Sequence, residues 1–105
     1  QMAFAIAPRI LAINFIGPEF EIQVQGFEPH LIGNEEIMLI VGADRLVRTN
    51  TNPPSQSEFV TPAAPPADTD KVIFRLPAGV VSGSDVPVRL VVRGVESAPL
   101  WVVAP

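Results

Sequence analysis

The sequence predicts an all-β domain arranged as a two-sheet sandwich of about seven short strands. Three strand-like runs follow one another near the end of the chain, at residues 71–77, 85–94 and 98–105, and turn residues separate them. The run at 85–94 carries an aliphatic side chain at every second position, which is the pattern of a strand buried on one face. These inward positions are Val86, Val88, Leu90 and Val92. No segment sustains the 3.6-residue period of an amphipathic helix.

Four more strands are predicted before residue 50. The first, at 9–15, follows Pro8 and ends before a Gly-Pro pair that breaks a β-ladder. The second, at 20–25, alternates apolar with polar residues, so one face is buried and the other is exposed to solvent. The third, at 36–42, is apolar in both phases, which requires that something also covers its second face. The fourth, at 45–49, follows a tight turn and pairs back onto the third.

The segment 50–70 departs from this pattern because it contains five prolines, no glycine and few large apolar residues. Its prolines favour an extended backbone along the surface, with a short edge strand at 58–61. Two interpretations remain open for this loop, a long crossover between the two sheets and a binding loop.

Seven short strands with regularly spaced turn signals predict a sandwich of immunoglobulin type. We expect one domain at 8–105, preceded by a lead-in or extra edge strand at 1–7, because 105 residues build a single core. The chain has no cysteine and no tyrosine, so the disulfide and tyrosine corner of antibody-like domains are absent.

Composition excludes several classes of function. The net charge is −4, and the seven lysines and arginines are scattered, which argues against nucleic acid as a partner. The lack of cysteine removes thiolate metal sites and thiol nucleophiles. No apolar run is long enough for a membrane helix, and the start, QMAFAIAP, lacks the basic region of a complete signal peptide. Only 17% of residues are charged, so we expect part of the surface to be apolar and to face a partner.

The sequence offers little catalytic equipment, and we expect neither an enzyme nor a cofactor. His30 is the only histidine and lies in a proline-flanked loop, which argues against a triad. Asp68 and Asp70 are weak candidates for calcium ligands, because calcium needs about six to eight oxygens and little else in the sequence supplies them. Glu35 and Glu36 are adjacent in a turn or strand, so their carboxylates diverge.

One candidate contact face emerges from the strand phases. In an immunoglobulin-type sandwich the strands at 36–42, 85–94 and 98–105 share a sheet. If the alternating core residues of these strands point inward, five apolar residues are left on the outer side of the sheet: Met38, Ile40, Val91, Trp101 and Val103. Two interpretations stay open, a partner surface and a face that the proline-rich loop or the lead-in covers.

The order of these motifs resembles a known family. A strand FEIQVQGF, a strand closing on Val41-Gly42, then VIFRLPAGVVSG, VRLVVRGVES and a final WVVAP resemble the IPT/TIG group of immunoglobulin-like domains. The phrase LPAGVVSG with the following GVES turn also resembles the C-terminal immunoglobulin-like domain of cap or tail-terminator proteins in bacterial contractile injection systems. The matching motifs are turn and core positions, so they imply a fold more than an activity.

We therefore expect a non-catalytic structural or docking module of a larger bacterial protein. Its partner would be another protein or a neighbouring domain, and self-association is possible through the same face. The alternative is a carbohydrate- or calcium-binding accessory domain of a cell-surface protein, with Trp101 as its one candidate sugar platform. The sequence leaves the compartment open between a cytoplasmically assembled particle and the cell surface.

Overall fold

The computed structural model describes residues 7–25, 33, 36–51, 53–61 and 71–105 of the chain. Within those ranges the protein is all-β, as predicted, and no residue lies in an α-helix. The strands are β1 (Arg9–Ile16), β2 (Glu19–Gln25), β3 (Ile37–Val41), β4 (Asp44–Arg48), β5 (Glu58–Val60), β6 (Lys71–Arg75), β7 (Asp85–Val92), β8 (Val95–Glu96) and β9 (Leu100–Val103). The predicted count of about seven strands is too low, because the short strand expected at 58–61 forms as β5 in addition to the seven main runs, and β8 was not predicted.

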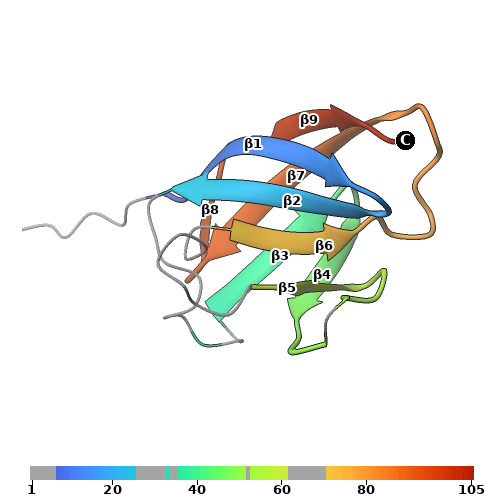
Figure 1. Cartoon of the computed structure of the whole chain (residues 1–105). Coiled ribbons are helices and arrows are strands. Elements are labelled where there is room, and N and C mark those ends of the chain that lie inside the picture. The colour runs from blue at the N-terminus through green and yellow to red at the C-terminus, as the bar shows by residue number, and fades with distance from the viewer. Residues whose placement is uncertain (1–6, 26–32, 34–35, 52, 62–70) are drawn as a thin grey trace, which may run out of the picture.

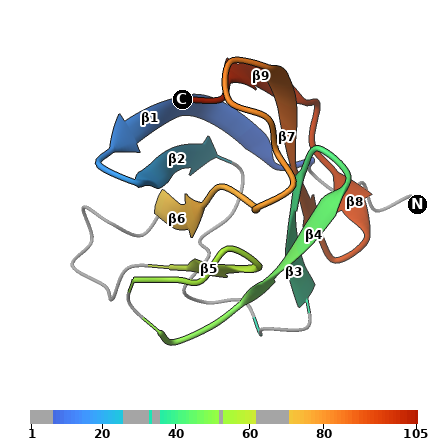
Figure 2. The same cartoon turned by 90° about the vertical axis from the view of Figure 1, so that its right-hand side faces the viewer.

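Backbone pairing joins the strands into one continuous sheet in the order β1-β2-β6-β5-β4-β3-β7-β8, and β9 also pairs with β7. Figure 1 shows β1, β2 and β6 lying across β3, β4 and β7, and Figure 2 shows the sheet curling until these groups face each other. The first strand comes close to β7 and β9. Among the described strands, however, no backbone pairing joins β1 to β9, so the sheet wraps nearly but not fully into a barrel.

The continuous sheet differs from the prediction of two separate sheets, and the difference arises at β4. This strand pairs with β3 in antiparallel fashion and with β5 in parallel. The Val47 N–H donates to the Ser57 carbonyl at 3.2 Å, and the Thr49 N–H donates to the Phe59 carbonyl at 2.9 Å. These bonds link the two halves of the sheet, so β5 lies between β4 and β6. The prediction of a short strand at 58–61 is therefore close in position but wrong in making it an edge strand.

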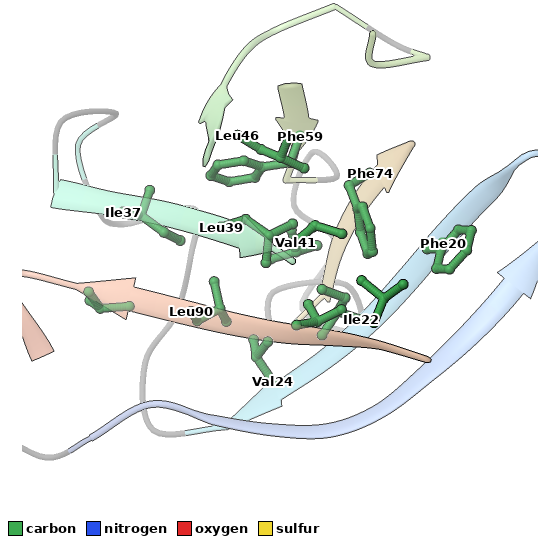
Figure 3. Close-up of a cluster of buried hydrophobic side chains, with 14 of the residues drawn as sticks. Phe20, Ile22, Val24, Ile37, Leu39, Val41, Leu46, Phe59, Phe74 and Leu90 are labelled. Carbon is green, nitrogen blue, oxygen red and sulfur yellow. The ribbon is translucent and has the colours of Figure 1, made fainter. Parts of the chain in front are cut away.

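The core lies between the two halves of the curled sheet. Phe20, Phe59 and Phe74 are fully buried and come from β2, β5 and β6. Figure 3 shows their rings in the same cluster as aliphatic side chains of β3 and β7. The inward phases predicted for these two strands are confirmed. Their buried residues are Ile37, Leu39, Val41, Val86, Val88, Leu90 and Val92.

Strand β1 contains a β-bulge. Its pairing with β2 is regular except between Ile10 and Ala12, which lie opposite Val24 and Gln23, so Leu11 is an extra residue without a register partner. The bulge changes the phase of the strand. As a result Ile10 and Ile13 both pack against the core, although they are three residues apart.

The loop between β6 and β7 is tied to the residues after β9. The Gly83 N–H donates to the Ala104 carbonyl at 2.7 Å, and the Ala104 N–H donates to the Ser84 carbonyl at 2.8 Å. The Ser82 hydroxyl also donates to the Pro105 carbonyl at 2.8 Å. These bonds continue the β7–β9 ladder past Val103, and Ala104 is buried in the core.

Part of the predicted organisation lies outside the described residues. Of the predicted lead-in at 1–7, the structure describes Ala7 alone. Of the predicted loop at 50–70, it describes residues 50–51 and 53–61, which include β5.

Candidate functional site

The outer side of β3, β7 and β9 brings the five predicted contact residues onto one face of the sheet. Met38 lies directly opposite Val91, and Ile40 lies opposite Arg89. At the other end of β7, Trp101 lies opposite Pro87. Directly opposed side chains on one face of a sheet are close neighbours, and diagonal ones are within reach of large side chains. Pro87 is the diagonal neighbour of Ile40 and lies opposite Trp101. It therefore joins Val91, Met38 and Ile40 to Trp101 in one apolar band.

The exposure of the face rises towards β9. Met38, Ile40 and Val91 are half-buried, whereas Trp101 is 61% exposed and Val103 is 56% exposed. The inward-facing neighbours of these two residues, Leu100 and Val102, are partly buried. The largest side chain of the face is therefore also among its most exposed.

Three residues of β7 on this face were not among the predicted contact residues, and one of them is the exposed Asp85, which lies opposite Val103. Pro87 and Arg89 share the phase of Val91 on β7, and both are half-buried between apolar neighbours. The alternation of the strand contains that information, since every second residue after Asp85 points outward. The face thus has a basic centre within an apolar band.

Arg89 makes an ion pair across the strands. One guanidinium nitrogen of Arg89 lies 2.5 Å from a Glu96 carboxylate oxygen, and the two side chains are 35% and 48% exposed. The Nε atom of Arg89 is buried and has no hydrogen-bond partner in the structure. Arg45 on β4 lies opposite Ile40 from the other side, so Ile40 sits between two arginines.

A second ion pair lies at the end of this sheet, beside the turn that joins β7 to β8. The Arg93 Nε lies 3.2 Å from a Glu36 carboxylate oxygen, and the Arg93 N–H donates to the Glu36 carbonyl at 2.7 Å. Glu36 therefore has a structural partner.

A shallow hollow of about 320 Å³ opens elsewhere on the surface, between the start of β4, the residues before β5 and the loop after β6. Its polar lining side chains are Asp44, Arg45, Gln56 and Ser57. It brings a hydroxyl group together with a carboxylate, but its lining includes no histidine that could act as a base. The hollow therefore does not form a nucleophilic site of the triad type.

Edge strand β1 exposes apolar side chains that the sequence analysis did not predict. Leu11, Phe15 and Ile16 are each about half exposed, at 48%, 51% and 53%. The Phe15 ring meets the buried Phe20 ring edge-on, with their centroids 4.5 Å apart. Strand pattern alone does not reveal such exposure, because it depends on which strand ends up at the rim.

Four other residues that the sequence raised as candidates for catalysis or metal binding lie outside the described residues. These are His30, Glu35, Asp68 and Asp70. Across the described ranges no group of three or more histidine, aspartate or glutamate side chains is placed to hold a metal ion. In the same ranges no helix is long and apolar enough to cross a membrane.

Comparison with known proteins does not assign the chain to a family. No protein-family model matches it, and a search of curated proteins found no match. A function for this chain is therefore inferred from the geometry of the face formed by Met38, Ile40, Val91, Trp101 and Val103.

Proposed function

We propose that the chain is a non-catalytic immunoglobulin-like module that docks a protein partner or a neighbouring domain through the face of β3, β7 and β9. We call the set Met38, Ile40, Val91, Trp101 and Val103 the docking face. The observation that carries the proposal is the exposure of Trp101 and Val103 at one end of a continuous apolar band.

The strand order supports the immunoglobulin-like part of the proposal. The order β1-β2-β6-β5 corresponds to the A-B-E-D sheet of such domains, and β3-β7-β9 corresponds to C-F-G. In this proposal β4 is the additional strand beside C, and its parallel pairing with β5 links the two sheets. The IPT/TIG resemblance, and the narrower one to domains of bacterial contractile injection systems, agree with a module of a larger assembly.

The composition of the face supports a protein partner. Aromatic residues, methionine and arginine are enriched at protein interfaces, and tryptophan and arginine recur among the residues that dominate binding energy. The docking face offers Trp101 and Met38 around Arg89. A sugar platform would need further exposed aromatic side chains on this face, and the chain has no second tryptophan and no tyrosine.

The proposal is tested with two variants of the face and one matched control. Trp101→Ala removes the exposed aromatic ring, and Ile40→Asp places a charge in the apolar band. Arg45 and Arg89 lie opposite position 40 on the two neighbouring strands, so the new carboxylate is expected to lie beside positive charge. Ile73→Asp is the control, because Ile73 is also half-buried but lies on the outer side of β6, across the molecule. Glu21 lies opposite Ile73, so circular dichroism must show that this variant keeps its fold.

The measurement is co-purification of partners with the tagged chain, quantified by mass spectrometry, with circular dichroism to check folding. Trp101→Ala is expected to weaken the complex about 30-fold, which corresponds to the loss of about 2 kcal/mol that defines a hot-spot residue. Ile40→Asp should also lose partners, and Ile73→Asp should keep them. Unchanged partner recovery by both face variants would show that this face does not dock.

A further inference from the structure

The hollow beside the start of β4 lies where the sheet lacks a short stretch of strand. Strand β5 pairs with β4 from Glu58 onward and with β6 from Phe59 onward. Before Glu58 the chain forms a turn, in which the Glu58 N–H donates to the Ser55 carbonyl at 3.3 Å. The hollow of about 320 Å³ opens at this place, between residues 44–46 of β4 and residues 77–79 after β6.

Arg45 turns two main-chain groups towards this hollow. The Val47 N–H and the Thr49 N–H both donate to carbonyls on the β5 side of β4. The main-chain groups of a strand alternate between its two neighbours with a period of two residues, so the N–H and C=O of Arg45 point to the same side. Among the described residues no main-chain hydrogen bond joins Arg45 to residues 55–57. Because Arg45 lines the hollow, both groups are available to a ligand there.

The lining of the hollow is rich in hydrogen-bond donors. The Arg45 guanidinium forms no ion pair with another residue that the structure describes. The turn at 77–80 is closed by its own hydrogen bond of 3.2 Å, and the N–H groups of Ala78 and Gly79 inside it donate to no described residue. The lining includes one acidic residue, Asp44, whose side chain points to the opposite face of the strand from that of Arg45. The donors therefore suit a carboxylate, which only accepts hydrogen bonds.

The size of the hollow matches a short piece of extended chain. A strand residue advances about 3.3 Å, neighbouring strands lie about 4.8 Å apart and packed sheets lie about 10 Å apart, so each residue takes about 160 Å³. The hollow of about 320 Å³ accordingly holds about two residues. Room for so few residues favours the end of a peptide over a segment that passes through.

We propose that the hollow binds the carboxy-terminal end of an extended peptide. The main chain of the peptide exchanges hydrogen bonds with the N–H and C=O of Arg45, as an added strand does. Its terminal carboxylate accepts hydrogen bonds from the N–H groups of Ala78 and Gly79 and from the Arg45 guanidinium. This site is distinct from the docking face, with which it shares no residue.

The probe that tests the proposal is N-acetyl-dialanine with a free carboxylate, titrated into the isotope-labelled chain and followed by its amide NMR resonances. A ligand of this size is expected to bind with a Kd of about 1 mM. Saturable shifts are expected at the N–H groups of Arg45, Ala78 and Gly79. The same peptide with an amidated carboxy terminus should bind about tenfold more weakly, because it loses the charge-assisted hydrogen bonds.

Arg45→Gln separates the contribution of the charge from that of the main chain. It removes the guanidinium but keeps the N–H and C=O, so it should weaken binding of the free-carboxylate peptide about tenfold and leave the amidated peptide unchanged. Arg9→Gln is the matched control, because Arg9 is an exposed arginine on β1 that does not line the hollow. This control should bind both peptides as the wild type does.

Three results would overturn the inference: a wild type without saturable shifts at these three N–H groups, equal affinity for the free and the amidated peptide, or equal losses in Arg45→Gln and Arg9→Gln. Tighter binding of alanyl-alaninamide, which has a free amine and no carboxylate, would also overturn it. The hollow would then select the amino-terminal end of a peptide, with Asp44 as the charged group that recognises it.

Discussion

At the scale of single residues, Ser97 shows how one polar side chain stabilises the turn into the last strands. It is almost fully buried, and its hydroxyl oxygen accepts a hydrogen bond at 2.9 Å from the Leu90 N–H. The same hydroxyl donates to the Ala98 carbonyl at 3.1 Å, and the Ser97 N–H donates to the Leu90 carbonyl at 2.7 Å. Ser97 therefore satisfies both main-chain groups of a core residue.

Replacing Ser97 by alanine should lower the free energy of unfolding by about 1–3 kcal/mol, because it leaves the buried Leu90 N–H without an acceptor. Urea denaturation with an unchanged m-value measures the effect. Ser82→Ala is the matched control, since the exposed Ser82 hydroxyl bonds the Pro105 carbonyl at the surface. Equal losses for the two variants would contradict this role for Ser97.

At the scale of elements, the turn between β3 and β4 depends on a glycine. Gly42 has a φ of 62°, in the left-handed region that residues with a side chain rarely adopt. Its N–H donates to the Pro87 carbonyl, which ties the turn to β7. A Cβ atom at this position would meet the Val86 side chain at 3.7 Å, an ordinary contact, so the backbone conformation is what disfavours other residues.

Gly42→Ala is accordingly expected to destabilise the protein by about 1–2 kcal/mol. Gly79→Ala provides the comparison, because Gly79 lacks a positive φ and a Cβ added there would meet nothing within 4 Å. Thermal unfolding of the two variants side by side gives the result. A loss at Gly79 as large as that at Gly42 would show that backbone conformation is not the cause.

How much could be predicted also differs from element to element. The core phases of β3 and β7 could be predicted because both strands pair regularly and alternate without interruption. The outer phase that contains Trp101 followed from the same pattern. Strand β1 could not be predicted in this way, because simple alternation groups Leu11 with Ile13. The bulge instead exposes Leu11 and turns Ile13 inward.

At the scale of the whole molecule, the parallel pairing of β4 with β5 joins two halves that the sequence predicts as separate sheets. Nothing in the local pattern reveals this pairing, because it is set by how the segment between the two strands folds back. It has a consequence for cooperativity. Phe59 on β5 is fully buried in the same cluster as Phe20 and Phe74, so the bridging strand belongs to the common core.

Phe59→Ala should therefore destabilise the whole domain by about 3–5 kcal/mol, the usual loss for a buried phenylalanine. Phe15→Ala makes the same chemical change at a side chain that is 51% exposed, and it should lose clearly less. Trp101 fluorescence and far-ultraviolet circular dichroism should report one coincident transition. Two separate transitions would mean that the halves of the sheet unfold independently.

The bulge in β1 also bears on how the chain tolerates a change in length. Removing Leu11 would leave the sequence Ile-Ala-Ile-Asn-Phe-Ile after Arg9, which alternates without interruption. Ile10, Ile13 and Phe15 would then keep the orientation they have now, because the bulge already absorbs the extra residue. A single-residue deletion at position 11 should therefore leave the following side chains of β1 on the faces of the sheet that they occupy now.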